Sequence, residues 1–339
     1  MAHKRLAALA AAVVTLGTVA PAMADTTAAP TGDYQVTGQD RYATSVMVSQ
    51  RTFKPGVDLV TIATGEGWVD SLAGAAVAAN AQGPLLLTQP TGLPANVKAE
   101  LKRLNPAAVL ITGGTGSVTL AAQAQIQATV PNAAIFRDGG PDRYQTAARI
   151  SADYYLDGAS AVYIVSGQDY HEAVMATSAA GLSGGPLLLA DKTLPAATKN
   201  ELVRLKGLGV ENVIVLGGTG SISPAVFDQI NAIFGKGTDG YPVTSRVAGA
   251  TPYATSVALT RILWGNGSLP PAKTVYYVNG EGWADALSAG PAAAAHDAPI
   301  VLTQRYCMPS APLAWTNQNA GTIKGRLWIG GITKSLKAC

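Results

Sequence analysis

The chain has 339 residues, of which 48% are hydrophobic and 13% are charged. Its 24 Lys and Arg residues become 22, against 21 Asp and Glu, once Lys4 and Arg5 are removed with the N-terminal segment described next. This near-neutral balance excludes a global polybasic mechanism for binding nucleic acid or a membrane. The high apolar share is typical of strands that helices bury on both faces.

The first 24 residues have the three parts of a secretory signal peptide. Lys4 and Arg5 precede an apolar stretch from Leu6 to Val19, and a small-residue cleavage site ends at Ala24. The stretch is shorter than the ~20 residues needed to cross a bilayer, so a membrane anchor is the less favoured alternative. We expect residues 1–24 to be a signal peptide, and the secreted chain to begin with a linker, residues 25–32.

Internal similarity is the strongest signal in the sequence, because four blocks occur three times in the same order. The first copy reads DRYATS, GEGWVDSL, GPLLL and ITGGTGSV, the second DRYQTA, GQDYHEAV, GPLLL and VLGGTGSI, and the third TPYATS, GEGWADAL, APIVL and WIGGITKS. Tyr42, Tyr144 and Tyr253 mark the copies at intervals of 102 and 109 residues. Such spacing is domain length, so each copy can carry its own core. The predicted repeats are residues 33–132, 133–240 and 241–339.

Each copy predicts an α/β unit in which strands alternate with helices. In the first copy, helices are expected at Tyr42–Phe53, Val69–Ala81, Pro94–Leu104 and Thr119–Gln127, and strands at Leu59–Ala63, Leu85–Thr88, Ala108–Thr112 and Ala133–Arg137. Apolar strands joined by helices indicate a mainly parallel sheet flanked by helices. The predicted fold is therefore three tandem small domains of this kind, the third of which lacks its fourth helix.

The Asp-Arg-Tyr elements at residues 40–42 and 142–144 are the most specific candidates for ligand binding. Arginine is a planar, bidentate donor for carboxylate or phosphate groups on a polymer. We therefore take Arg41, Tyr42, Arg143 and Tyr144 as candidate contacts. The alternative is a local pair between each arginine and its neighbouring aspartate that fixes the helix start. The third copy has Pro252 at the arginine position.

Two tryptophans lie just after the first strand of their copies, where α/β sheets bind ligands. Trp68 and Trp283 could stack on a sugar, and the second copy has Tyr170 nearby instead. The alternative is an aromatic lid on the core. In that case Asp70 and Asp285 would simply favour the helix dipole.

A second arginine set and the glycine loops complete the candidates. Arg137 and Arg246 lie on the strand before each repeat, with Gln35 at the first such position. The Gly-Gly loops could hold an anion at a helix N-terminus, but they fit no dinucleotide or P-loop pattern. A tight turn that needs glycine is the favoured interpretation. Lys334 aligns with Ser117 of the first copy.

Catalysis and metal binding find little support in the sequence. The acidic residues near Trp68 and Trp283 repeat in register, which is typical of a structural role. His171 and His296 are the mature histidines, and neither stands at metal-ligand spacing from a cysteine. We therefore predict no catalytic residue, no metal and no cofactor. Cys307 and Cys339 could close a disulfide loop of about thirty residues in an oxidising compartment, worth roughly 3–4 kcal/mol.

The four blocks together resemble the cell-wall-binding repeat 2 (CWB2) family, and the resemblance runs from about Gly38 to Cys339. It implies three compact α/β modules with approximate threefold pseudo-symmetry, on a surface protein of a Gram-positive bacterium. It also implies non-covalent attachment to an anionic wall polysaccharide. The Leu-Leu motif and the repeat arginines are implicated in such attachment, which adds the residues Leu86, Leu87, Leu188 and Leu189.

Our first hypothesis is accordingly a secreted, wall-associated protein without enzymatic activity. It would hold an anionic glycopolymer in grooves between repeats through arginine contacts and aromatic stacking. A cell-wall hydrolase of the amidase type is the first alternative. A secreted module that binds a small ligand or a protein through the glycine loops is the second.

Overall fold

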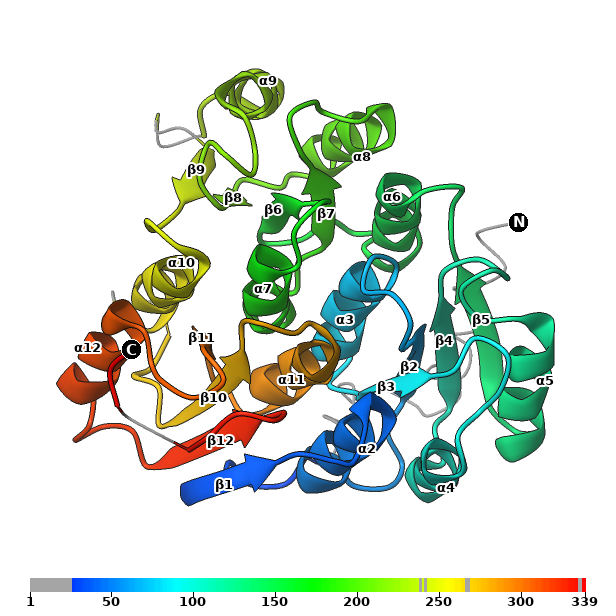
Figure 1. The fold of residues 1–339 in the computed structure, drawn as a ribbon. Helices are drawn as coiled ribbons and strands as arrows, with labels where there is room; N and C mark the ends of the chain where they lie inside the picture. Colours follow the sequence, from blue (N-terminus) through cyan, green and yellow to red (C-terminus); the bar gives the residue numbers. More distant parts are fainter. Residues whose placement is uncertain (1–25, 238–239, 241–242, 266–268, 335–336) are drawn as a thin grey trace, which may run out of the picture.

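The computed structural model describes residues 26–237, 240, 243–265, 269–334 and 337–339. The predicted signal peptide, residues 1–24, lies outside them. Three sheets of four parallel strands each form the frame, and helices flank them (Figure 1). The α/β fold predicted from the repeats is confirmed. No helix in the described part of the chain is long and apolar enough to cross a membrane.

The first sheet follows the predicted elements closely. In spatial order its strands are β3 (Leu85–Thr88), β2 (Leu59–Thr64), β4 (Ala108–Thr112) and β5 (Ala134–Asp138), and its helices are α2 (Arg41–Thr52), α3 (Ser71–Asn80), α4 (Ala95–Leu104) and α5 (Leu120–Thr129). The strands β2, β3 and β4 are buried along their whole length, as near-continuous apolar runs require.

The other two sheets repeat this order with different details. The second has β7 (Leu187–Ala190), β6 (Val162–Ser166), β8 (Val213–Leu216) and β9 (Thr244–Val247), with α6 (Arg143–Tyr154), α7 (His171–Leu182), α8 (Ala196–Gly207) and α9 (Pro224–Phe234). The third has β1 (Gly32–Val36), β12 (Gly325–Ile329), β10 (Thr274–Asn279) and β11 (Ile300–Thr303), with α10 (Pro252–Thr260), the π-helical turn η1 (Arg261–Gly265), α11 (Ala284–Ala295) and α12 (Ser310–Gln318).

The fourth strand of the first and second sheets comes from the copy that follows in the sequence. The strand β5, which leads into the second copy, pairs with β4, and β9 pairs with β8 in the same way. The described residues after β12 contain no fourth helix and no further strand, so β1 fills that edge, with Val36 opposite Ile329. The first and last strands therefore close the three copies into a ring, as Figure 1 shows.

Three helices, one from each copy, pack against one another at the centre of the molecule (Figure 1). They are α3, α7 and α11, which are rich in alanine and buried on nearly all sides. Gly181 lies so close to Ala79 and Ala294 that an added Cβ would stand 2.5 and 3.0 Å from their Cβ atoms. Because small residues let the helices approach, one large apolar core extends through all three copies. A second, smaller cluster of buried residues lies wholly within the third copy, so the apolar core is shared between the copies only in part.

Each copy begins its first helix with a side-chain cap. Asp40, Asp142 and Thr251 accept hydrogen bonds from the backbone N–H groups three residues later, at 2.7, 2.8 and 3.2 Å. Such caps satisfy donors that a helix start leaves unpaired. At the other end of the chain the disulfide between Cys307 and Cys339 is present, with Cα atoms 5.0 Å apart, and secures the C-terminal segment.

Candidate ligand-binding junctions

The predicted arginines and tryptophans meet where one repeat contacts the next. Arg143 of the second repeat lies over the Trp68 ring of the first, with Cζ 5.5 Å from the ring centroid. Arg41 of the first repeat lies over the Trp283 ring of the third at 5.0 Å. We call these contacts the 1–2 junction and the 3–1 junction. A cation over an aromatic face contributes about 0.5–1 kcal/mol where it is exposed.

Each of these arginines is the first residue of its helix and is held by one hydrogen bond. Nη1 of Arg41 donates to the carbonyl oxygen of Gly65, and Nη1 of Arg143 donates to that of Gly167. The aspartates beside them cap their helices through backbone N–H groups, so the arginine is anchored by a carbonyl group. Nε and Nη2 of both guanidinium groups make no hydrogen bond to the described residues and remain available to a ligand.

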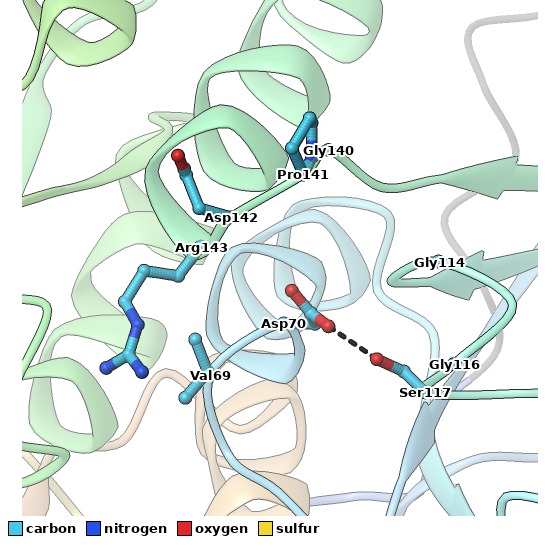
Figure 2. Close-up of a pocket in the computed structure, with 9 residues that line it drawn as sticks. All are labelled: Val69, Asp70, Gly114, Gly116, Ser117, Gly140, Pro141, Asp142 and Arg143. Atoms are coloured by element: carbon cyan, nitrogen blue, oxygen red, sulfur yellow. Dashed lines mark hydrogen bonds between the residues drawn. The ribbon is translucent and has the colours of Figure 1, made fainter.

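A cavity of about 420 Å³ opens at the 1–2 junction (Figure 2). Its lining combines the glycine loop of the first repeat with the start of α6, and consists of Val69, Asp70, Gly114, Gly116, Ser117, Gly140, Pro141, Asp142 and Arg143. Hydrogen bonds from Gln145 lower the pKa of Asp142, which keeps this carboxylate ionised. The cavity thus offers a guanidinium for an anionic group, with carboxylate and backbone acceptors for hydroxyl groups.

The glycine loops are turns held beneath a carboxylate. Gly113 has φ +90°, and a Cβ there would stand 2.6 Å from Oδ2 of Asp70. Ser117 donates to the same oxygen at 2.7 Å, as Figure 2 shows. Gly217 and Gly330 also have a positive φ, and they lie against the equivalent acidic residues, Glu172 and Asp285. Only glycine fits both the conformation and the close approach, which supports the turn interpretation.

The second arginine set supports these loops from below. Nη1 of Arg137 donates to the carbonyl oxygens of Gly113 and Gly114 at 3.0 and 3.1 Å, and Arg246 reaches Gly217 at 2.8 Å. Gln35 donates to Gly330 at 2.7 Å, so it takes the same place for the third loop. Burial lowers the pKa of Arg137 and of Arg246. Each of these residues serves the loop of the preceding repeat in the ring, and their predicted contact with a ligand stays a prediction.

The predicted tyrosines face inward. The Tyr42 hydroxyl donates to Oε1 of Glu66 at 2.9 Å, and burial with this carboxylate raises the pKa of Tyr42 to about 12. The Tyr144 hydroxyl donates to Asp191. Their rings pack on Gly65 and Gly167, where an added Cβ would stand within 2.7 Å of ring atoms. The tyrosines therefore position the strand ends that anchor the arginines.

The Leu-Leu motif lies in the core strands β3 and β7. The four leucines are 0 or 1% exposed, and they are Leu86, Leu87, Leu188 and Leu189. They present no surface to a polymer in this structure. Any influence on binding would pass through the packing of the sheets.

The third glycine loop differs from the sequence expectation. Thr333 donates its N–H to the Arg305 carbonyl at 2.8 Å, as Thr119 does to Pro90 at 2.8 Å. Ile332 is buried as Val118 is. Thr333 thus takes the place of Thr119, and this loop is three residues shorter than the first. The alignment of Lys334 with Ser117 was wrong, because identical glycines hid the deletion.

The contact between the second and third repeats, the 2–3 junction, uses Tyr170, the counterpart of the two tryptophans, and His171, which was not predicted as a contact residue. His171 Nε2 lies 2.7 Å from the Gly280 carbonyl oxygen, and the Tyr170 hydroxyl donates to the same oxygen at 3.1 Å. Gly280 is the equivalent of Gly65 and Gly167, which the arginines contact. The sequence held one signal for this contact. The third copy has Pro252 in place of the arginine, and the second copy is the one with a histidine, His171, directly after its aromatic residue.

The fold and these junctions define a class of protein, a ring of three α/β repeats with cation-aromatic contacts between them. The chain belongs to the Cell wall binding domain 2 (CWB2) family, whose model matches residues 35–123, 137–227 and 246–336. Three copies of that domain follow one another along it.

Solved structures show the same architecture. Cwp6 from Clostridium difficile superposes with a TM-score of 0.78 at 30% identity, over 91% of this chain and 46% of that one. Cwp8 from the same organism gives 0.77 at 24% identity, over 89% and 50%. The second likeness shows the fold alone.

Two relatives from Bacillus subtilis (strain 168) are similar in sequence. The N-acetylmuramoyl-L-alanine amidase LytC is 28% identical over 269 residues, which is 79% of this chain and 50% of that protein. The amidase enhancer is 24% identical over 303 residues, 86% of this chain and 39% of that protein. The chain spans half or less of the length of these relatives. Among the described residues no three His, Cys, Asp or Glu side chains are grouped to hold a metal ion.

Proposed function

We propose that the chain binds an anionic glycopolymer of the bacterial cell wall at its arginine-bearing junctions. The observation that carries this proposal is the guanidinium of Arg143, which lies beside Trp68 at a polar cavity with Nε and Nη2 unpartnered among the described residues. Phosphate and carboxylate groups match the planar donors of arginine. Sugar hydroxyls match the carboxylates of Asp70 and Asp142 in the lining.

The 3–1 junction offers the same donors. Arg41 lies over Trp283, and the Asp285 carboxylate is close enough to Arg41 and Asp40 for both charges to affect its pKa. Burial raises the pKa of Asp285, and the hydrogen bond of Thr44 and the charge of Arg41 partly oppose this. A polymer with repeating anionic groups could engage both junctions of one molecule, which would strengthen attachment without any new contact.

We also propose that the protein acts outside the cell and without catalysis of its own. The signal peptide predicted at residues 1–24 supports export. The regular recurrence of Asp70, Glu172 and Asp285 above the glycine loops supports a structural role for these acids. The likeness to an N-acetylmuramoyl-L-alanine amidase makes a hydrolase of the amidase type the second candidate.

Sedimentation with purified cell walls tests the binding proposal. Because exposed charges are screened over ~10 Å at 0.1 M salt, bound protein should decrease as salt rises. The double change Arg41→Ala, Arg143→Ala should weaken binding by about tenfold or more. Arg261→Ala is the matched control, since Arg261 is exposed and hydrogen-bonds Gln318 away from the junctions. Binding insensitive to both salt and the double change would defeat the proposal.

A gel containing cell walls distinguishes the two candidate functions. A binding module leaves the walls intact, whereas a hydrolase clears them and releases soluble fragments. Clearing by the purified wild-type chain would replace our proposal with the hydrolase function.

A further inference from the structure

The 2–3 junction lacks the arginine that the other two junctions share. The helix α10 begins at Pro252, whereas α2 and α6 begin at Arg41 and Arg143. Proline fits the first position of a helix, so the helix itself is not disturbed. The carbonyl oxygen of Gly280 is thereby left without the donor that its own repeat would supply.

The second repeat supplies donors to this oxygen instead. His171 Nε2 and the Tyr170 hydroxyl lie 2.7 and 3.1 Å from it. Their rings stack with centroids 4.3 Å apart. In the other repeats the histidine position holds Val69 or Ala284, which cannot donate a hydrogen bond. The substitution of proline for arginine in one repeat is thus matched by a histidine in its neighbour.

Both nitrogens of His171 are used within this contact. Nε2 faces a carbonyl oxygen and Nδ1 faces the Asp169 carboxylate, and both of these groups only accept. The geometry therefore favours the doubly protonated imidazolium. At the other two junctions, the arginine donates one hydrogen bond to a glycine carbonyl oxygen, and its Nε and Nη2 can still donate to a ligand. His171 keeps no donor.

The charges around this contact are unfavourable for an anion. Asp169 and Glu172 act on His171, and the charge of Glu281 acts on Tyr170 and Tyr253. These acidic groups come from the loop after β6, from α7 and from the loop after β10. One imidazolium that is already paired with Asp169 cannot offset them for a passing polyanion.

We infer that the 2–3 junction is a closed structural clasp, and that the chain takes the anionic polymer at two junctions and not at three. The inference rests on the proposed function, because it concerns which junctions bind. His171 is a positioning residue that joins two repeats, whereas Arg41 and Arg143 contact the polymer.

Binding to purified walls by single and combined variants tests this inference. Arg41→Ala and Arg143→Ala should each weaken binding, and together they should leave only salt-insensitive background. His171→Val, which copies Val69, should leave wall affinity within about twofold of wild type, since ~0.4 kcal/mol is the corresponding free energy. Thermal unfolding and circular dichroism should show that each variant is folded.

A variant in which the 2–3 junction regains an arginine tests the inference by a gain of binding. His171→Val with Pro252→Arg introduces the valine and the arginine of the 1–2 junction, and it should bind walls several-fold more tightly than His171→Val alone, with a steeper dependence on salt. If this variant folded but bound no better than His171→Val, the inference would be overturned. It would also be overturned if the double arginine variant retained binding that depends on salt and adding His171→Val to that variant abolished this remaining binding. If the double arginine variant bound walls as tightly as the wild type, the proposed function would be overturned, and with it the inference that two junctions bind the polymer.

Discussion

Arg137 donates through Nη1 to the carbonyl oxygen of Gly113 at 3.0 Å, and so joins the last strand of the first sheet to the loop that lines the cavity. The same guanidinium donates through Nε to Gln123 at 2.9 Å. This places a charge beneath a loop whose glycine cannot be replaced without strain. The loop conformation, and with it the cavity, depends on a residue that is 24 positions further along the chain.

Arg137→Ala should therefore destabilise the protein. It removes hydrogen bonds from a charged donor to two loop carbonyls, each of which contributes about 1.5–3 kcal/mol, partly offset by hydration of the freed groups. We expect a loss of roughly 2–3 kcal/mol in the free energy of unfolding, measured in urea. The control is Arg261→Ala, whose exposed hydrogen bond to Gln318 at 3.3 Å should contribute little. Equal losses for both variants would contradict this account.

The clasp at the 2–3 junction should make stability depend on pH. Burial opposes protonation of His171, but the hydrogen bond and charge of Asp169 outweigh it and raise the pKa of His171. A raised histidine pKa gives stability that is complete below the ordinary value of about 6.5 and is lost as pH rises through the folded-state pKa. Wild type should thus exceed His171→Val in stability at mildly acidic pH, and by less at alkaline pH. If the stability of the two proteins changed with pH in the same way, a protonated His171 in the folded protein would be excluded.

Ionisation of Asp169 determines how far the pH can fall before the contact at the 2–3 junction loses its stabilising effect. Burial works against its ionisation, but the hydrogen bonds and charge of His171 prevail and lower the pKa of Asp169. The stability that it contributes is present above its ordinary pKa and is lost as pH falls through the lowered value. Asp169→Asn should therefore reduce stability at mildly acidic pH and also remove the dependence on His171, because the two residues act as one pair. Additive losses in a double-mutant cycle would argue against this coupling.

His296 should respond to pH with the opposite sign. His296 is 7% exposed, its Nδ1 lies 2.7 Å from the Tyr276 hydroxyl oxygen, and burial lowers the pKa of His296 to about 4. The unfolded chain takes up this proton first, so stability is lost as pH falls from about 6.5 towards 4. The predicted loss is up to about 3 kcal/mol. His296→Gln should flatten the acidic limb of the stability curve, and an unchanged limb would refute the assignment.

The central three-helix contact predicts a large effect of a single methyl group. Gly181→Ala places a Cβ about where Ala79 and Ala294 already pack, so it should destabilise by roughly 1–3 kcal/mol in spite of the higher helix propensity of alanine. Gly207 in α8 is the matched control, because an added Cβ there meets nothing within 4 Å. Gly207→Ala should be neutral or gain about 0.5–1 kcal/mol. Thermal unfolding of both variants distinguishes crowding from helix propensity.

Several features of the fold could be predicted because they depend on neighbours in the sequence. Asp40 and Asp142 begin helices since a cap needs only the N–H groups three residues later. The buried strands were visible as apolar runs. The pairing of Cys307 with Cys339 was available because the chain has no other cysteine.

The edges of the sheets could not be predicted in the same way. An apolar strand such as β5 fits the sheet before it or the sheet after it, and periodicity does not distinguish them. The short third loop was missed for a related reason, since Ile332 could be matched to Val118 only through its burial and the hydrogen bond of the next residue.

The sequence by itself determined three α/β repeats, their parallel strands, their helix starts and the cysteine pair, because each follows from local periodicity, capping or the residues available. Only the tertiary structure decided that Val36 closes the ring against Ile329, that Arg143 lies over Trp68, and that His171 meets the carbonyl that Pro252 leaves without a donor. Those contacts join residues 75 to 293 positions apart in the sequence. Their partners are fixed by how three copies pack around shared small-residue helices, which no single stretch of sequence encodes.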